Sequence, residues 1–414
     1  MPDQRNIVVL GASYAGLRAA HYILRYVIPQ LPSDGNATYR LLLVDPSTKW
    51  YARHAAPRAA TGKDTIPYDR IFLDIEPGFT QYGNHFSFVQ GKATAWDSDG
   101  RSITVAKVNG GNVVLPYHAL VLATGSKTDS PLFTAQADGY EKIQAALDAF
   151  HKQLASAKRI IITGGGATAV ETAGELGEHL NGAAGWFASR PTSPKAEIIV
   201  ITNSARLLPN LRPAIGATAE TYLHRVGVDV RYGTKVSTSR QLPNGKTAVV
   251  LHDGEELETD IYVPAVGVQP LSEYIPAQLK DGKGYVVQNS QTLRVDAAGA
   301  RVYAVGDVGS ASRNGILDIM DEIPVLGTNL RRDLLAAHTD IHAKPEGKDR
   351  CFEPNMKETQ LVPVGRSKGV GAVFGWRIPS LVCWLIKGRD YMLGGAPDTI
   401  NGGKWTKEVP WTAT

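Results

Sequence analysis

Cysteine is scarce in this chain of 414 residues, which contains only Cys351 and Cys383. Two cysteines so far apart exclude a disulfide scaffold and also exclude a redox-active pair of the CxxC or Cx4C type. Such rarity is typical of a reducing compartment, which we expect to be the cytoplasm. We expect both thiols to be buried among apolar side chains.

Long apolar runs and strong charge are also missing. No run approaches the roughly 18 residues of a membrane-spanning helix, and the net charge of +4 is spread along the chain. We therefore expect no integral membrane segment and no nucleic-acid partner. We also expect no signal peptide and, because Pro2 follows the initiator methionine, no N-myristoylation. The short apolar segment 378–386 (IPSLVCWLI) predicts a core helix rather than an element that dips into a membrane.

The strongest pattern in the chain is an apolar run followed by a glycine-rich turn, and it occurs twice. The first run, 7–10 (IVVL), precedes Gly11–Gly16, and the second, 159–162 (RIII), precedes Gly164–Ala169 about 150 residues later. Continuous β-branched runs predict parallel strands buried on both faces, each followed here by a helical pattern. Two such turns predict two dinucleotide-binding βαβ units.

The first unit carries the features of an FAD site. Gly11 permits a tight bend, Gly16 lets the helix approach the strand, and backbone N–H groups of the turn face a pyrophosphate. Strand 39–45 ends in Asp45, whose carboxylate can bind an adenosine ribose. A later apolar strand ends in Gly306 and Asp307, where a carboxylate can accept a hydrogen bond from a ribityl hydroxyl, a group that FAD has and NAD lacks. In the first turn the predicted cofactor residues are Gly11, Ala12, Ser13, Tyr14, Ala15 and Gly16.

The second unit has the form GxGxxAxE, through Gly164, Gly166, Ala169 and Glu171. Its return strand, 196–202, is followed by no acid that would hold a ribose 2′-hydroxyl, and Arg206 lies nearby in the sequence. A 2′-phosphate would therefore not be repelled, so we favour NADPH over NADH. Glu171 is either a carboxylate beside the nicotinamide or an exposed helix residue, and Arg206 is either a phosphate ligand or a solvated side chain.

The order of the patterns predicts the architecture. Segment 86–121 alternates like a small antiparallel insertion and leads to a strand that ends at Thr124 and Gly125, two further predicted cofactor residues. Segment 229–267 repeats that order, so we predict an α/β fold with two Rossmann-like domains, the second inserted in the first as in glutathione reductase, plus an α+β carboxyl-terminal domain. A helix from about 325 to 337 should have Pro324 in its first turn. The predicted domains are 1–127 and 271–338 for FAD, 128–270 for NAD(P)H, and 339–414.

The chain resembles the ferroptosis-suppressor and apoptosis-inducing-factor-like group of FAD-dependent NAD(P)H oxidoreductases, distant relatives of type II NADH dehydrogenases. The segments GRSKGVG (365–371) and LIKGRD (385–390) are similar to that group's GRNDGVG and LxKSRD. The resemblance implies that Arg58 contacts the flavin nucleotide and that Ala93 gives backbone contacts to adenine. It also implies that Lys387 lies near the isoalloxazine, where its cation would stabilise reduced flavin. Met392 departs from the group, which has an aromatic residue there, and so does the segment 323–327 (IPVLG).

These patterns predict an oxidoreductase that passes a hydride from NAD(P)H to FAD and then to a quinone-like or other small organic acceptor, without a redox disulfide. Lys387 and Glu171 are the predicted catalytic residues, and no metal site is expected. The alternative is a flavin oxidase or dehydrogenase of a biosynthetic pathway, which oxidises an organic substrate with O2 and has a vestigial NAD(P)H site. The long loop 181–195 favours that alternative, and the intact glycines at 164 and 166 oppose it. Whether the chain forms a homodimer stays open.

Overall fold

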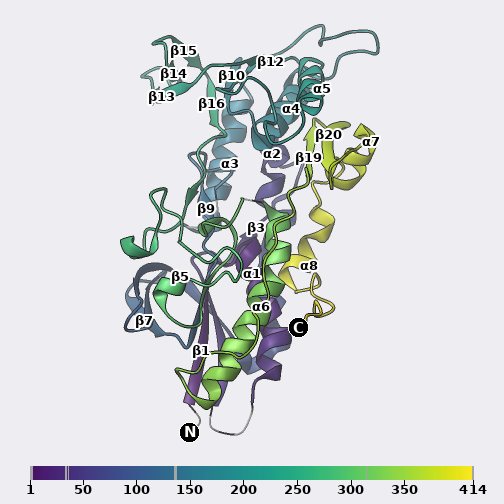
Figure 1. Ribbon diagram of the computed structural model, residues 1–414. Helices are drawn as coiled ribbons and strands as arrows, with labels where there is room; N and C mark the ends of the chain where they lie inside the picture. Colours follow the sequence, from purple (N-terminus) through teal and green to yellow (C-terminus); the bar gives the residue numbers. More distant parts are fainter. Residues whose placement is uncertain (1–2, 33–34, 36, 135–137, 314, 413–414) are drawn as a thin grey trace.

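The computed structural model describes residues 3–32, 35, 37–134, 138–313 and 315–412. Figure 1 shows a larger sheet in the lower half of the molecule, a smaller one in the upper half, and the yellow carboxyl-terminal segment along one side of both. This arrangement confirms the predicted α/β fold. The exact domain boundaries stay predictions.

The larger sheet has the strand order β18-β8-β1-β2-β5-β6-β7. Its parallel part pairs β1 with β2 and β8, and β8 with β18. The apolar residues of β1 are fully buried, as expected of a strand covered on both faces. The strands are β1 (Asp3–Leu10), β2 (Ala37–Asp45), β5 (Phe86–Asp97), β6 (Ser102–Lys107), β7 (Asn112–Pro116), β8 (Ala119–Leu122) and β18 (Val302–Ala304).

The segment that we expected to be a separate antiparallel insertion is an extension of this sheet. β5 begins parallel to β2 and continues antiparallel to β6, so the sheet turns into a meander at one edge. β18 joins the sheet beside β8 although about 180 residues separate the two strands. Within the chain between them, residues from about 140 to 264 form an inserted unit with sheets of its own, as the repeated pattern predicted.

The inserted unit contains a parallel sheet of order β12-β11-β10-β16 and an antiparallel sheet of order β13-β14-β15. The strands are β10 (Arg159–Thr163), β11 (Glu197–Ile201), β12 (Val228–Arg231), β13 (Val236–Gln241), β14 (Thr247–Leu251), β15 (Glu256–Thr259) and β16 (Ile261–Pro264). The helices are α3 (Tyr140–Leu154), α4 (Ala167–Asn181) and α5 (Pro213–His224). Each glycine turn therefore lies between a central strand and a helix.

Helix α6 (Ile316–Thr339) starts earlier than we predicted. Pro324 lies inside it and not in its first turn, because packing of this helix against α1 (Tyr14–Tyr22) outweighs the local preference of proline for a helix start. α6 runs beside α1, as Figure 1 shows. At Gly327 an added Cβ would lie 2.2 Å from a ring carbon of Tyr22, so only glycine permits this close helix contact.

The carboxyl-terminal segment forms a small antiparallel sheet and short helices against α4, α5 and α1. Our expectation of a core helix at 378–386 was wrong, since Cys383 is buried but Leu381 is 63% and Leu385 49% exposed. In the part of the chain that the structure describes, no helix is long and apolar enough to cross a membrane. The elements are β19 (Gln360–Val364), β20 (Lys368–Val373), β21 (Trp376–Arg377), α7 (Ser380–Cys383), the π-helix η9 (Trp384–Gly388) and α8 (Ala396–Ile400).

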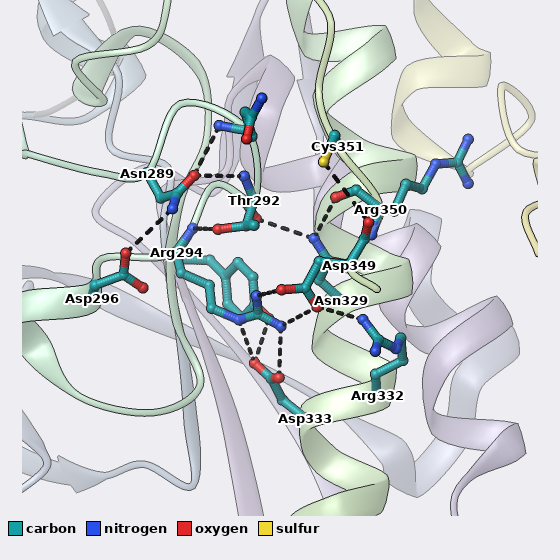
Figure 2. Close-up of polar contacts among 12 residues, drawn as sticks. Asn289, Thr292, Arg294, Asp296, Asn329, Arg332, Asp333, Asp349, Arg350 and Cys351 are labelled. Atoms are coloured by element: carbon teal, nitrogen blue, oxygen red, sulfur yellow. Dashed lines mark hydrogen bonds and ion pairs between the residues drawn. The ribbon is translucent and has the colours of Figure 1, made fainter. Parts of the chain in front are cut away.

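A polar network fastens the segment after α6 to the larger domain (Figure 2). Arg294 donates to both oxygens of Asp333 on α6, at 3.0 and 2.8 Å, and to Asp349 at 2.5 Å. The Tyr303 hydroxyl donates to the same Asp333 at 2.5 Å. Asn329 donates to the carbonyl of Arg350 at 2.8 Å. Charged groups that share so many hydrogen bonds hold α6 and the following segment in one position.

Replacing Asp333 by alanine is expected to lower the free energy of unfolding by about 2–3 kcal/mol, because Arg294 and the Tyr303 hydroxyl lose a charged acceptor inside the protein. Chemical denaturation measures this change. Glu256→Ala, which breaks an exposed pair with Arg240, is the matched control and should change stability by less than about 0.5 kcal/mol. Equal effects of the two variants would contradict the assigned role of the network.

Candidate functional site

The first turn leaves no room for a side chain at either of its two glycines. Gly11 has a φ of +99°, and a Cβ there would lie 2.4 Å from the carbonyl oxygen of Ala123. At Gly16 a Cβ would lie 1.7 Å from the carbonyl oxygen of Gly11. The N–H of Ala12 donates to the Asp45 carboxylate at 2.6 Å. The turn, the next strand end and the start of α1 are thus held together in the shape of a dinucleotide-binding cradle.

A cavity lies directly beside this turn, and several of the predicted residues line it together. It is bounded by the ends of β1 and β2, by the start of the meander and by the segment after β8. Such a cavity at the carboxyl ends of parallel strands fits the adenosine and pyrophosphate half of FAD. Its lining residues are Leu10, Gly11, Ser13, Val44, Asp45, Pro46, Gly91, Lys92, Ala93, Thr124, Leu271, Glu273 and Tyr274.

Asp307 lies beside the same turn, because Gly306 approaches Ala15 so closely that a Cβ would be 2.9 Å from the Ala15 Cβ. The Asp307 carboxylate accepts hydrogen bonds from Arg53 at 2.9 Å and from the Ser126 hydroxyl at 2.8 Å. Arg53 is not among the site residues predicted from the sequence. The fully buried Glu322 of α6 accepts the N–H of Gly306 at 2.7 Å.

The predicted flavin contact Arg58 forms its hydrogen bonds with α4 and the carboxyl-terminal segment. Its guanidinium donates to Glu175 of α4 at 2.8 Å and to the carbonyl of Arg389 at 3.1 Å. The Tyr391 hydroxyl donates to the same Glu175 at 3.1 Å. The guanidinium that pairs with Asp307 is therefore that of Arg53, and a contact between Arg58 and the flavin stays a prediction.

The two predicted catalytic residues form an ion pair, although 216 residues separate them in the sequence. Lys387, in η9, donates to Glu171 of α4 at 2.5 Å and to the carbonyl of Leu361 at 3.2 Å. Glu171 is only 4% exposed, so its interpretation as an exposed helix residue was wrong. Burial raises the pKa of Glu171 to about 6, and the Lys387 ammonium opposes that shift. A buried, paired carboxylate on the helix of the second turn is thus held against the carboxyl-terminal segment.

The second glycine turn keeps space for a ligand at Gly166. Gly164 has a φ of +130°, and a Cβ there would lie 2.6 Å from the Ala265 carbonyl oxygen, whereas a Cβ on Gly166 would meet no atom within 4 Å. Ala169 is buried in α4. Arg206 donates to the carbonyl of Pro209 at 2.8 Å, beyond the end of β11. The open space at Gly166 is what close approach of a pyrophosphate requires.

Tyr14 and His54 form a further polar contact that the sequence patterns did not single out. The Tyr14 hydroxyl hydrogen-bonds to Nδ1 of His54, and the two rings pack edge to face. Burial, together with the nearby Lys387 ammonium, lowers the pKa of His54 to about 4. At neutral pH this imidazole is uncharged and lies close to both the first turn and Lys387.

Neither thiol has a disulfide partner. Cys383 is buried, as expected, and its burial raises the thiol pKa to about 11. Cys351 is exposed, so our expectation of burial was wrong there. It lies in the polar segment after α6, where its thiol contacts the carbonyl oxygen of Asp349 at 3.8 Å (Figure 2).

Comparison with known proteins agrees with this geometry. The model of the pyridine nucleotide-disulphide oxidoreductase family matches residues 5–324. "Oxidoreductase phnG" of Penicillium herquei is 42% identical over 416 residues, which covers 98% of each chain. Ferroptosis suppressor protein 1 of Taeniopygia guttata is 26% identical over 407 residues and 93% of each chain, which confirms the resemblance. The solved structure of NDH2 from Plasmodium falciparum in complex with NADH has a TM-score of 0.66 at 13% identity and covers 98% of this chain and 99% of that one.

The glycine cradle, the cavity beside it and the open space at Gly166 fit the FAD and NAD(P)H cofactors of this family. The family match covers both turns. The chain therefore belongs to the pyridine nucleotide-disulphide oxidoreductase family and is an oxidoreductase that depends on FAD and NAD(P)H.

Proposed function

We propose that this oxidoreductase takes a hydride from NAD(P)H and passes the electrons directly to a quinone-like or other small organic acceptor, with no thiol as an intermediate carrier. The observation that carries the proposal is the ion pair between the partly buried Lys387 and the buried Glu171. It joins α4, which begins at the second turn, to the carboxyl-terminal segment, which also packs on α1, the helix that begins at the first turn. Bound FAD would supply the redox chemistry between the two turns.

The protein's own groups would position the reactants and balance their charge. Lys387 holds a cation where negative charge develops on reduction, and Glu171 fixes the direction of that ammonium. Because Glu171 is buried and only 16% of the Lys387 side chain is exposed, little water screens them. On the other side, Arg53 and Ser126 fix Asp307 as the acceptor for a ribityl hydroxyl. These fixed charges need no rearrangement during the reaction, and this is how we expect them to accelerate it.

Direct transfer to the acceptor is supported by the state of the two thiols. Cys383 is buried, with a pKa raised to about 11, which disfavours the nucleophilic thiolate. Cys351 is exposed and free. We also propose a reducing compartment such as the cytoplasm, which two free thiols support.

A second candidate function is favoured by Tyr14 and His54. A neutral imidazole hydrogen-bonded to a phenol can accept a proton from a substrate hydroxyl while that substrate is oxidised. The enzyme would then be a flavin oxidase or dehydrogenase that uses O2, with a vestigial NAD(P)H site.

Double-mixing experiments distinguish these functions. The enzyme is first reduced anaerobically with dithionite and then mixed with a soluble benzoquinone or with O2. The proposed function predicts that the quinone restores the flavin absorbance at least about tenfold faster than O2 does, and that a Cys351→Ser, Cys383→Ala variant is equally fast. Fast reoxidation by O2 with none by quinones would overturn it in favour of the oxidase.

Arg206→Ala is expected to raise the KM for NADPH about tenfold and to leave that for NADH unchanged, because one charge-assisted hydrogen bond to a 2′-phosphate is lost. Steady-state kinetics with each nucleotide measure the two KM values. Arg240→Ala, on the antiparallel sheet, is the control and should change neither value. If Arg206→Ala affected both nucleotides alike, Arg206 would have no role in choosing the phosphate.

A further inference from the structure

Glu322 carries a fully buried carboxyl group, and one of its two oxygens accepts no hydrogen bond. Its side chain is 0% exposed on α6. Oε2 accepts the N–H of Gly306 at 2.7 Å, but Oε1 contacts no hydrogen-bond donor among the residues that the structure describes. A neutral amide or a backbone carbonyl could accept the Gly306 N–H at a lower desolvation cost. A carboxyl with a free oxygen at this place therefore calls for an explanation.

The charges that face Glu322 do not compensate it. On α6 itself lie Asp318, which pairs with Arg313, and Asp321. On the adjoining turn lies Asp307, which pairs with Arg53. From α1, Arg18 reaches α6 at Met320. Among the described residues no lysine, arginine or histidine forms an ion pair with Glu322.

Burial, followed by the like charges of Asp318, Asp307 and Asp321, raises the pKa of Glu322 to about 7, against the lowering effect of the Gly306 N–H. The group therefore changes its protonation state near neutral pH. Because a raised pKa means that the folded state binds the proton more tightly, its stabilising contribution is present below pH 4.5 and is lost as the pH rises through about 7.

We propose that Glu322 is the group that takes up a proton when the flavin bound at the Gly306–Asp307 turn is reduced, and that releases it again on reoxidation. Two-electron reduction by a hydride adds two electrons and one proton, and so places one negative charge in the site. That charge would be a further neighbour of a carboxylate that already faces three acids. Glu322 then takes one proton from solvent at Oε1, so that the net charge of the site stays constant.

This proposal rests on FAD at the first turn and not on the identity of the acceptor. The site provides the two features that it needs: a carboxyl shielded from water, and a direct hydrogen bond from that carboxyl to the residue before Asp307. Glu322 acts on the flavin through charge and not through bond making. We therefore regard it as a positioning residue whose protonation follows the redox state.

The test is the pH dependence of the flavin midpoint potential, measured with reference dyes and a chemical reductant so that no nicotinamide is needed. At pH 8 the carboxyl is mostly ionised in the oxidised protein, so the wild type is expected to take up nearly one proton more per flavin than Glu322→Gln, which keeps an oxygen for the Gly306 N–H but cannot titrate; this excess should shrink toward pH 6.5. Glu256→Gln, at an exposed carboxylate of the antiparallel sheet that pairs with Arg240, should behave as the wild type. Equal proton uptake in the wild type and Glu322→Gln would overturn the proposal.

Two further measurements apply if Glu322→Gln does not retain FAD. The reduced-minus-oxidised infrared difference spectrum of the wild type should show the carbonyl band of a newly protonated carboxyl, and its absence would overturn the proposal. In the apoprotein, the free energy of unfolding of the wild type relative to Glu322→Gln should fall as the pH rises from 4.5 to about 7. A constant difference between the two would mean that Glu322 does not titrate and would contradict the proposal.

Discussion

Gly11→Ala is expected to weaken FAD binding strongly. A Cβ at this position would meet the Ala123 carbonyl oxygen at 2.4 Å, and the φ of +99° is strained for any residue except glycine. Strain of about 1–3 kcal/mol and overpacking of about the same size would deform the turn that faces the pyrophosphate. We expect an FAD affinity at least about 100-fold lower, because each 1.4 kcal/mol corresponds to a factor of ten. Flavin absorbance per mole of purified protein measures the result.

Gly166→Ala is the matched variant in the second turn. Gly166 has no positive φ, and its Cβ would meet no protein atom within 4 Å. This variant should therefore fold and retain FAD, but bind NAD(P)H more weakly, because the new methyl group occupies the space that a pyrophosphate needs. A Gly11→Ala protein with a full complement of FAD would contradict the placement of FAD at the first turn.

Lys387→Met is expected to slow the reduction of the flavin by NAD(P)H about 100-fold, which is the typical loss when one preorganised charge is removed from an active site. The substitution also leaves Glu171 buried without its cation, which costs about 3–5 kcal/mol of stability in comparable pairs. Glu171 should then be protonated at neutral pH, because burial already raises its pKa to about 6 with Lys387 present. Anaerobic stopped-flow absorbance gives the rate, and chemical denaturation gives the stability.

The double variant Lys387→Met, Glu171→Leu separates the two effects. It removes both charges, so most of the stability should return while the reduction rate stays low. Lys368→Met, at an exposed lysine of β20 in the same carboxyl-terminal segment, should change neither quantity. A Lys387→Met enzyme that is reduced at the wild-type rate would show that the pair has only a structural role.

The fold could be predicted from the sequence where local chemistry dictates it. Runs of β-branched residues that end in glycine turns indicate buried parallel strands, and these occur at β1 and β10. The helix start at Ile316 was missed, because Pro324 is a strong local signal that tertiary packing against α1 overrides. The exposure of Leu381 and Leu385 was missed for a related reason, since an apolar run does not reveal whether another element covers it.

Parts of the candidate site depend on contacts that no sequence spacing contains. The pattern selected Glu171, and the resemblance selected Lys387, but only the packing of η9 against α4 brings them together. In the segment RHAAPR the two arginines are equivalent by type, and the fold turns Arg53 toward Asp307 and Arg58 toward Glu175. Glu322 had no local signal, because its burial follows from the position of α6 beside Gly306.

Anaerobic mixing of the FAD-loaded protein with NADPH and, separately, with NADH tests the central claim most directly, namely that the two glycine turns hold two cofactors that exchange a hydride beside Glu171 and Lys387. We predict that the flavin absorbance is bleached completely within one turnover and that NADPH reacts faster than NADH. No bleaching by either nucleotide, in protein that dithionite reduces fully, would contradict the account.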